Sequence, residues 1–329
     1  MKRLIKKTVL ASGALRLASH YQPPGTAILM FHSVLQDPEQ YADILGGIAH
    51  SENEFRAQME LVARDFQPVG LETLVKCLND GEPLHKRSVV ITFDDGYRDN
   101  YEVAMPILNQ LGIPATFYIT VDCIEKKKLP WPSRLRFAVR NTKLAAWTDS
   151  GANTWKLDSP CVREQVFATL CNECCQLAGQ AQEDFVMRVE QDFGAILPAT
   201  FSSLMMDYDQ VRGLLRHGHI VGSHTMTHPN MAYVGERDAR LEFAGSKEHL
   251  ERELRSPVQH FAYPCPALSP HWNEQTVELS RELRYCSAVT TDVALTRRGD
   301  NPLCLRRMRP TKTAEGLRWN LERAFAAPV

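Results

Sequence analysis

Residues Ser88-Val89-Val90-Ile91-Thr92-Phe93-Asp94-Asp95-Gly96-Tyr97 carry the strongest structural signal in this chain. The first six form a continuous apolar run rich in β-branched side chains, which is typical of a strand buried on both faces. Gly96 marks a turn directly after this strand. The sequence therefore places two adjacent carboxylates, Asp94 and Asp95, at the carboxyl end of a buried strand. Such neighbours repel each other unless a divalent cation or a proton relieves the repulsion.

A second strand pattern, residues 219–223, is followed by His224-Thr225-Met226-Thr227-His228. Two imidazoles four residues apart would face the same way on one helical turn. This spacing is a known way to hold one metal ion. Taken alone, each motif is also compatible with an ordinary turn or surface loop. Together they predict a metal site beside a second carboxylate that is not needed as a ligand.

The two motifs, T-F-D-D-G-Y and G-S-H-T-x-T-H-P, are similar to the signature of the polysaccharide deacetylase family, which includes rhizobial chitooligosaccharide deacetylases and carbohydrate esterases of family four. Further similar segments are residues 28–34, 112–118 and 261–264, so the resemblance runs from about residue 26 to 310. It implies an α/β fold, a distorted (β/α) barrel of about seven parallel strands whose working residues follow the strands.

The pattern along the chain agrees with such a barrel. Apolar residues recur at helical spacing after the Ser51 cap, over residues 71–78 and before Gly112, between the strand patterns. This alternation indicates parallel strands, because parallel neighbours need helical crossovers. Residues 121–206 break the rhythm, and we predict that they form a partly helical insertion on the barrel rim. The expected organisation is a basic segment at 1–25 and a barrel domain at 26–329.

The resemblance also implies roles for individual residues. Asp95, His224 and His228 are expected to hold a divalent metal ion, with Zn²⁺ as the favoured ion, and Asp94 is expected to act as general base. Arg307 matches an arginine that a subset of relatives carries, and it would orient Asp94. The alternative for Arg307 is a surface salt bridge.

The resemblance implies two further roles, at positions where this sequence departs from the common family pattern. A backbone N–H near Tyr263 would stabilise the oxyanion, although Cys265-Pro266 stands where tyrosine-glycine often follows the proline. The usual carboxyl-terminal histidine motif is absent, and some relatives place the equivalent histidine on the opening strand, which nominates His32 as general acid. The alternative for His32 is a core histidine bonded to a backbone carbonyl.

The implied function is a metal-dependent hydrolase that removes N-acetyl groups from a GlcNAc-type polysaccharide, oligosaccharide or glycolipid. An O-acetyl esterase or N-deformylase acting on another sugar is the alternative among enzymes. A catalytically inactive carbohydrate-binding relative is the alternative from another class, although binding alone would not require Asp94. The sequence names neither the sugar nor the oligomeric state.

The composition indicates which binding partners and which redox compartment to expect. The formal net charge is −1 and there is no long basic block, so nucleic acid is not expected as a partner. The nine cysteines lack the paired spacing of a disulfide framework, which favours a reducing compartment. Cys171, Cys174 and Cys175 are interpreted as one buried helix face rather than as metal ligands.

The amino-terminal segment allows several interpretations. Its cationic residues are Lys2, Arg3, Lys6 and Lys7. A signal peptide is disfavoured because Arg16 interrupts the apolar run. A basic amphipathic helix, in peripheral contact with an anionic membrane through residues 1–20, and a solvated terminus remain. We therefore expect a cytoplasmic protein, peripheral at the inner membrane surface if this helix binds lipid, and consider secretion the less favoured alternative.

Overall fold

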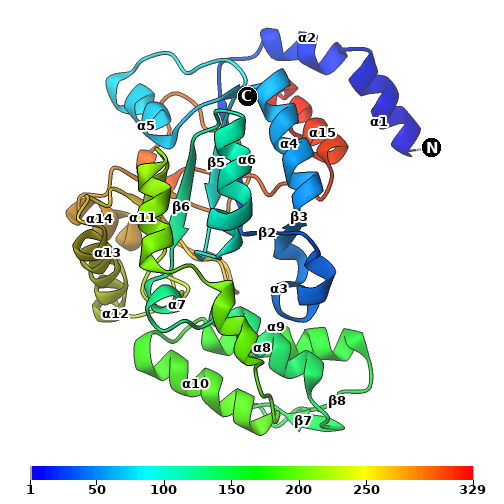
Figure 1. Ribbon diagram of the computed structural model, residues 1–329, viewed down its shortest axis with the longest axis vertical. Coiled ribbons are helices and arrows are strands. Elements are labelled where there is room, and N and C mark those ends of the chain that lie inside the picture. Colours follow the sequence, from blue (N-terminus) through cyan, green and yellow to red (C-terminus); the bar gives the residue numbers. More distant parts are fainter. Residues whose placement is uncertain (1, 329) are drawn as a thin grey trace.

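The structure is a computed structural model that describes residues 2–328, with side chains described from Lys6 onward. Its centre is a seven-stranded sheet with the strand order β1-β5-β6-β9-β10-β11 and with β4 beside β5 (Figure 1). All neighbouring pairs in this sheet are parallel, as the βα alternation predicts. The strands are β1 (Thr26–Phe31), β4 (Gln67–Pro68), β5 (Ser88–Phe93), β6 (Ala115–Ile119), β9 (Ile220–Ser223), β10 (His260–Ala262) and β11 (Ser287–Val289).

A short extended segment, Leu305 to Met308, connects the two ends of the sheet. The Leu305 N–H donates to the Ala288 carbonyl at 2.9 Å, and the Met308 N–H donates to the Ile28 carbonyl at 2.7 Å. These contacts bridge β11 to β1 in parallel fashion. The sheet is therefore curled into the distorted barrel that the sequence predicts, and Arg307 lies between the two bridging residues.

Amphipathic helices cover the barrel. Ser51 begins α4 by accepting a hydrogen bond from the Glu54 N–H, and the helix buries Phe55, Met59 and Val62 against the sheet. The covering helices are α4 (Glu52–Asp65), α5 (Leu71–Asp80), α6 (Met105–Gln110), α11 (Tyr208–Arg216), α12 (Glu236–Arg240), α13 (Ser246–Leu254), α14 (Glu274–Glu282) and α15 (Ala314–Ala326).

Shorter elements lie around these helices. Two are single π-helical turns, η3 (Asn100–Ala104) and η5 (Leu241–Gly245). A small sheet pairs β2 (Ser33–Leu35) with β3 (Ala49–Ser51) in parallel, between α4 and α3 (Figure 1). The remaining short turns are α3 (Ala42–Leu45), η1 (Pro38–Tyr41), η2 (Gly46–Ile48), η4 (Ala199–Leu204) and η6 (Pro302–Cys304).

Residues 121–206 form a mostly helical unit below the barrel (Figure 1). Its elements are α7 (Val121–Glu125), α8 (Trp131–Asn141), the antiparallel pair β7 (Ala146–Thr148) and β8 (Thr154–Lys156), α9 (Pro160–Cys174) and α10 (Gly179–Asp192). Helices α8, α9 and α10 share an apolar cluster that is distinct from the barrel core. Cys171, Cys174 and Cys175 are buried in this cluster, in agreement with the predicted helix face.

The amino-terminal helices α1 (Lys2–Ala11) and α2 (Ala14–His20) lie beside α15 at the other end of the molecule (Figure 1). Arg87, which directly precedes β5, donates to Ser19 of α2 at 3.1 Å and to Glu322 of α15 at 2.9 Å. The segment is thus helical and attached near the amino ends of the strands, in contrast to a solvated terminus. The side chains of Lys2, Arg3, Leu4 and Ile5 lie outside the described residues, and the membrane contact stays a prediction.

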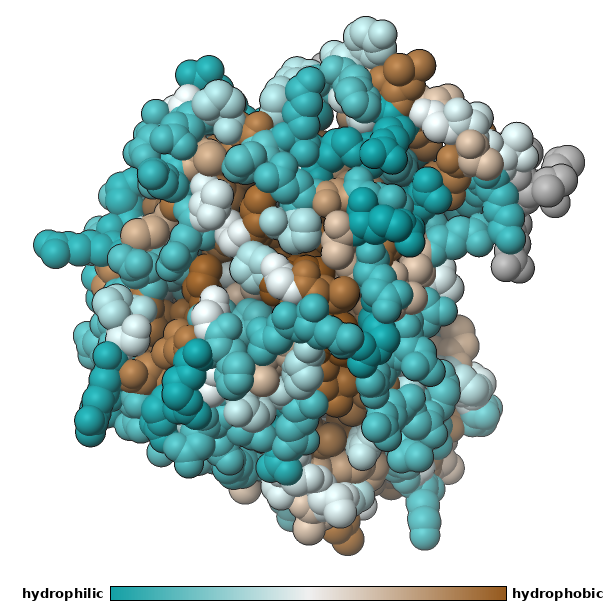
Figure 2. All heavy atoms as spheres, turned by 45° about the horizontal axis from the view of Figure 1, so that its top comes forward, coloured by the Kyte–Doolittle hydropathy of each residue, from teal (hydrophilic) through white to brown (hydrophobic). Residues whose placement is uncertain are grey.

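Within residues 2–328, no helix combines the length and the apolar character needed to cross a membrane. Hydrophilic side chains dominate the face seen in Figure 2, with hydrophobic ones in smaller groups between them. Leu10 belongs to the segment 1–20 that was expected to contact lipid, but it is only 8% exposed and packs inward. Leu17 and Tyr21, by contrast, are largely exposed at the end of α2.

Candidate active site

The two aspartates occupy a tight turn at the end of β5. The Gly96 N–H donates to the Asp94 carbonyl at 3.0 Å, and both Asp95 and Gly96 have positive φ angles of 74° and 91°. A side chain at Gly96 would also place its Cβ 3.1 Å from the Ile124 side chain. Both the positive φ angle and this close contact therefore favour glycine here. The turn directs both carboxylates into the cavity at the carboxyl edge of the sheet.

His224 and His228 lie on a loop after β9, so the predicted helical turn is wrong. The loop reverses through left-handed backbone at Thr225 and His228, with φ angles of 68° and 66°. His224 bonds through Nδ1 to the Ala262 carbonyl at 2.8 Å. Because a carbonyl can only accept, Nδ1 carries the proton and the Nε2 lone pair stays available to a metal.

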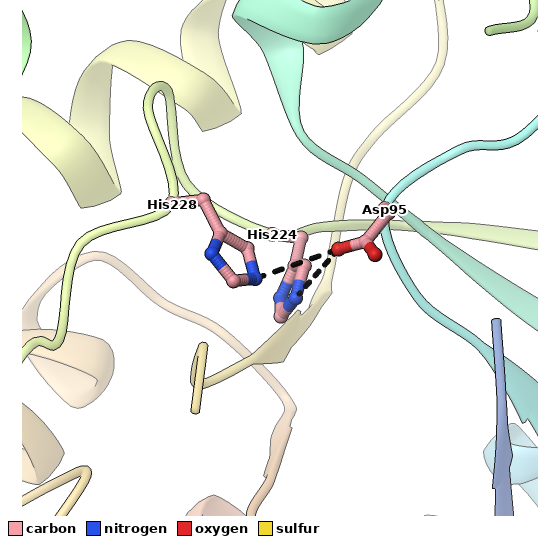
Figure 3. Close-up of side chains that lie close together, drawn as sticks. All are labelled: Asp95, His224 and His228. Atoms are coloured by element: carbon pink, nitrogen blue, oxygen red, sulfur yellow. Dashed lines mark ion pairs between the residues drawn. The ribbon is translucent and has the colours of Figure 1, made fainter. Parts of the chain in front are cut away.

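Asp95, His224 and His228 converge in the cavity (Figure 3). The Oδ1 atom of Asp95 lies 3.6 Å from Nε2 of His224 and 3.4 Å from Nε2 of His228. Potential ligand atoms of the three residues all lie within 4.8 Å of one another.

This donor set fits a divalent cation. Asp95 Oδ1 is buried without a hydrogen-bond partner among the described atoms. Burial and the neighbouring Asp94 charge raise the pKa of Asp95 to about 8, while burial lowers the pKa of both histidines. Uncharged imidazoles beside a carboxylate that lacks a counter-charge are the donors that zinc-type ions bind.

Asp94 is paired with Arg307 in the interior. Two parallel hydrogen bonds of 2.7 and 2.8 Å join the guanidinium to the carboxylate, and Arg307 also donates to the Thr290 carbonyl at 2.9 Å. Burial alone would raise the pKa of Asp94, but the charge and hydrogen bonds of Arg307, together with His224 and His32, outweigh burial and hold this pKa below its ordinary value. Arg307 is only 1% exposed, which excludes the surface salt bridge considered for it.

His32 directly follows β1 and lines the same cavity. In the part of the chain that the structure describes, its ring has no hydrogen bond to a backbone carbonyl, in contrast to the core-histidine alternative. Burial lowers the pKa of His32 to about 4, with opposing contributions from Asp94 and Arg307. The ring is therefore held near the reacting groups without a partner of its own.

Tyr263 does not offer the backbone donor that was expected near it. Its N–H donates to the Val289 carbonyl at 3.0 Å, and its buried hydroxyl donates to the Leu303 carbonyl at 3.2 Å. This residue is thus part of the sheet and core. Pro264 has no N–H, so the next amide is that of Cys265, which lines the cavity and has no acceptor among residues 2–328. The expected oxyanion donor therefore moves from Tyr263 to Cys265.

Two residues that support the histidine loop were not expected as such. Glu242, buried on η5, accepts hydrogen bonds from the backbone N–H groups of Met226 and Thr227 at 2.8 and 2.9 Å and from the Thr227 hydroxyl at 2.6 Å. Trp131 of α8 donates to the His228 carbonyl at 2.9 Å. No local motif indicates that Glu242 or Trp131 would support this loop.

The cavity itself has a volume of about 460 Å³, within the usual range of small-molecule sites. One side is formed by the ends of the barrel strands. The insertion forms the other side through Pro132, Arg136 and Phe167, so residues 121–206 do shape the cavity. Cys265 and Arg309 lie at its edge.

Comparison with known proteins places this chain among related sequences. A family model described as polysaccharide deacetylase matches residues 81–167 and 187–287. YxkH of Bacillus subtilis (strain 168) is 19% identical over 296 residues, which are 90% of this chain and 75% of YxkH. Poly-beta-1,6-N-acetyl-D-glucosamine N-deacetylase of Escherichia coli (strain K12) is 38% identical over 52 residues, only 16% of this chain and 8% of that protein.

The fold has a counterpart among solved structures. The Streptococcus pyogenes deacetylase PplD, solved in complex with acetate, superposes with a TM-score of 0.59 at 20% identity. The match covers 90% of this chain and 97% of PplD. At this identity the likeness concerns the fold, and it agrees with the distorted barrel described above.

Proposed function

The chain belongs to the polysaccharide deacetylase family, and from that premise we propose that it removes N-acetyl groups from a GlcNAc-type glycan. The family comprises hydrolases of N-acetyl amide bonds, so the reaction class follows from membership. The substrate is the proposal. It is supported by the short match to an enzyme whose name specifies poly-N-acetylglucosamine.

One observation supports this proposal: an ionised carboxylate and three potential metal ligands lie side by side in one cavity. Asp94 is kept ionised by Arg307, while Asp95 and the two histidines of the loop offer three ligand atoms to one cation. A divalent cation held there would supply the positive charge that acidifies water and polarises an acetyl carbonyl. Zn²⁺ is the ion that we favour for this donor set.

The protein groups divide the remaining work. Asp94 accepts a proton from the attacking water, and Arg307 positions it for that task. The Cys265 N–H donates to the oxygen of the acetyl group as negative charge develops there. His32 is uncharged at neutral pH because burial lowers its pKa, so it would take up the proton that Asp94 removes from the water and pass it to the departing amine.

The experiment is acetate release from acetylated glycans by the wild-type chain and by Asp94→Asn. We expect release from chitooligosaccharides or poly-N-acetylglucosamine, and a loss of roughly 100-fold or more in the variant. Sugars that carry only O-acetyl or N-formyl groups serve as comparison substrates. Release from O-acetyl or N-formyl sugars alone, or binding without any release, would contradict the proposed substrate.

A further inference from the structure

We propose that the cavity accepts an acetamido sugar that carries an anionic group, a phosphate or a carboxylate, and that Arg136 and Arg309 bind this group. The proposal rests on the proposed function, because it concerns the same cavity. The proposal specifies that the substrate carries a negative charge, a property that the family motifs do not indicate.

Two arginines, Arg136 and Arg309, line the cavity together with the two aspartates. Within the described residues, the only carboxylates in its lining are Asp94 and Asp95. Asp94 is already neutralised by Arg307, and Asp95 lies against the two ligand histidines. Arg136, which also pairs with Glu164 outside the cavity, and Arg309 are therefore the cationic side chains of the lining that the reaction does not use.

Arg136 is held in place at the cavity by contacts on three sides. Its guanidinium lies 4.1 Å from the centre of the Phe167 ring, a stacking contact suited to arginine. Gly46 lies close to the same guanidinium, because a Cβ at this position would be only 3.1 Å from the guanidinium carbon. Glu164 binds Nη1 at 3.2 Å from outside the cavity and is shared with Arg140 at 3.6 Å.

These contacts leave donors of Arg136 available. Only Nη1 has a hydrogen-bond acceptor within residues 2–328, so Nε and Nη2 are unpaired. A planar guanidinium with free donors on one side suits phosphate and carboxylate oxygens. Because its position is already fixed, little side-chain entropy remains to be lost on binding.

Arg309 provides a second cation near the reacting groups. It is exposed, no carboxylate among the described residues lies within ion-pair distance, and its one polar neighbour is the Cys265 sulfur at 4.0 Å. Its charge is felt at His32, whose pKa it helps to lower. Through its contact with Cys265, Arg309 lies on the side of the cavity where the acetyl group is expected, and Arg136 lies on the insertion side.

The test is calorimetric binding to the wild-type chain, which requires no turnover. The probes are neutral N-acetylglucosamine, N-acetylglucosamine 1-phosphate, a hyaluronan tetrasaccharide for the carboxylate and inorganic phosphate alone. We expect at least one anionic sugar to bind roughly tenfold or more tightly than the neutral sugar. One hydrogen bond between charged groups increases affinity by about this factor. The phosphate and carboxylate probes distinguish the two sources of the anion. The preference should shrink at about 0.5 M salt.

Variants assign the effect to the two arginines. Arg136→Gln and Arg309→Gln should each lose most of the preference, and Arg136→Lys should retain part of it because the charge remains. Arg140→Gln is the matched control on α8, because Arg140 shares Glu164 with Arg136 but does not line the cavity. Arg306→Gln is the control for Arg309. Both controls should bind as the wild type does.

Equal binding of neutral and anionic sugars, no binding of either anionic sugar, or equal losses in the control variants would overturn the inference. Deacetylation of chitooligosaccharides with equal efficiency in wild type and both Arg→Gln variants, without preference for anionic sugars, would leave the proposed function intact while the inference fails. Absence of acetate release from every N-acetylated sugar would instead contradict the proposed function.

Discussion

The side chain of His32 illustrates how much of the chemistry depends on single residues. It lies in the cavity without a hydrogen-bond partner for its ring among the described residues, as a group that must exchange a proton with substrate would. We predict that His32→Ala lowers turnover of an N-acetyl amide roughly 100-fold or more but spares an activated aryl acetate, whose leaving group needs no proton. Steady-state rates on both substrates test this. Equal losses on the two would indicate a structural task.

The buried pair of Asp94 and Arg307 makes a prediction about stability. Removing one partner leaves an uncompensated charge in the interior, so Arg307→Met should lower the free energy of unfolding by about 3–5 kcal/mol. The double variant Asp94→Asn/Arg307→Met should recover part of this loss, because both charges are then gone. Chemical denaturation measures all three proteins.

An exposed ion pair serves as the control for that cycle. Arg240 and Glu282 are 2.7 Å apart with both side chains about half exposed, and such pairs contribute about 1 kcal/mol or less. Arg240→Met should therefore cost little. A similar small cost for Arg307→Met would show that the buried pair matters less than its geometry suggests.

At the scale of elements, the histidine loop depends on a neighbouring π-helical turn. Glu242→Ala would leave the N–H groups of Met226 and Thr227 without their acceptor, and the loop that presents His228 would lose its support. We predict metal affinity roughly 10–100-fold weaker, the usual consequence of losing such outer contacts. Competition with a chelator measures it.

The control for Glu242 is Glu248→Ala on α13, which follows η5 directly and exposes Glu248 to solvent. This variant should bind metal as the wild type does. Unchanged affinity in a folded Glu242→Ala protein would refute the positioning task assigned to Glu242.

The same elements show what the sequence can and cannot predict. The strand before Asp94 and the strand before His224 are visible as apolar runs, and parallel strands bring their carboxyl ends to one edge, so convergence of the site could be predicted. The conformation of the histidine loop could not be predicted. The left-handed backbone at Thr225 and His228 accompanies hydrogen bonds that form only in the folded loop, from Met226 and Thr227 to Glu242 and from the His228 N–H to the Thr225 hydroxyl. The backbone donor was misplaced because pairing of Tyr263 with β11 depends on the sheet as a whole.

At the scale of the whole molecule, the segment predicted to contact the membrane and the candidate active site lie at opposite ends. The proposed catalytic groups follow the carboxyl ends of the strands, whereas α1 and α2 attach to α15 near the amino ends (Figure 1). We predict salt-sensitive binding of the protein to anionic vesicles through α1, with each cation contributing on the order of 1 kcal/mol. Replacing Lys2, Arg3, Lys6 and Lys7 by Gln should abolish this binding and leave acetate release unchanged.

Charge replacement is a sharper test than deleting residues 1–20. The deletion would uncover α15 and remove the Ser19 contact with Arg87, so it should also lower stability. Vesicle sedimentation at low and high salt measures binding. Undiminished sedimentation of the quadruple variant, or none for the wild type at low salt, would contradict peripheral attachment through α1.

The division of labour between the two neighbouring aspartates is the central claim, and metal titration of Asp94→Asn and Asp95→Asn beside acetate release tests it most directly. The account predicts that Asp94→Asn binds about one equivalent of divalent metal with near wild-type affinity yet releases acetate roughly 100-fold or more slowly. Asp95→Asn should lose tight metal binding together with activity. Loss of metal from Asp94→Asn with retention by Asp95→Asn, or full activity of metal-free wild-type protein, would contradict the account.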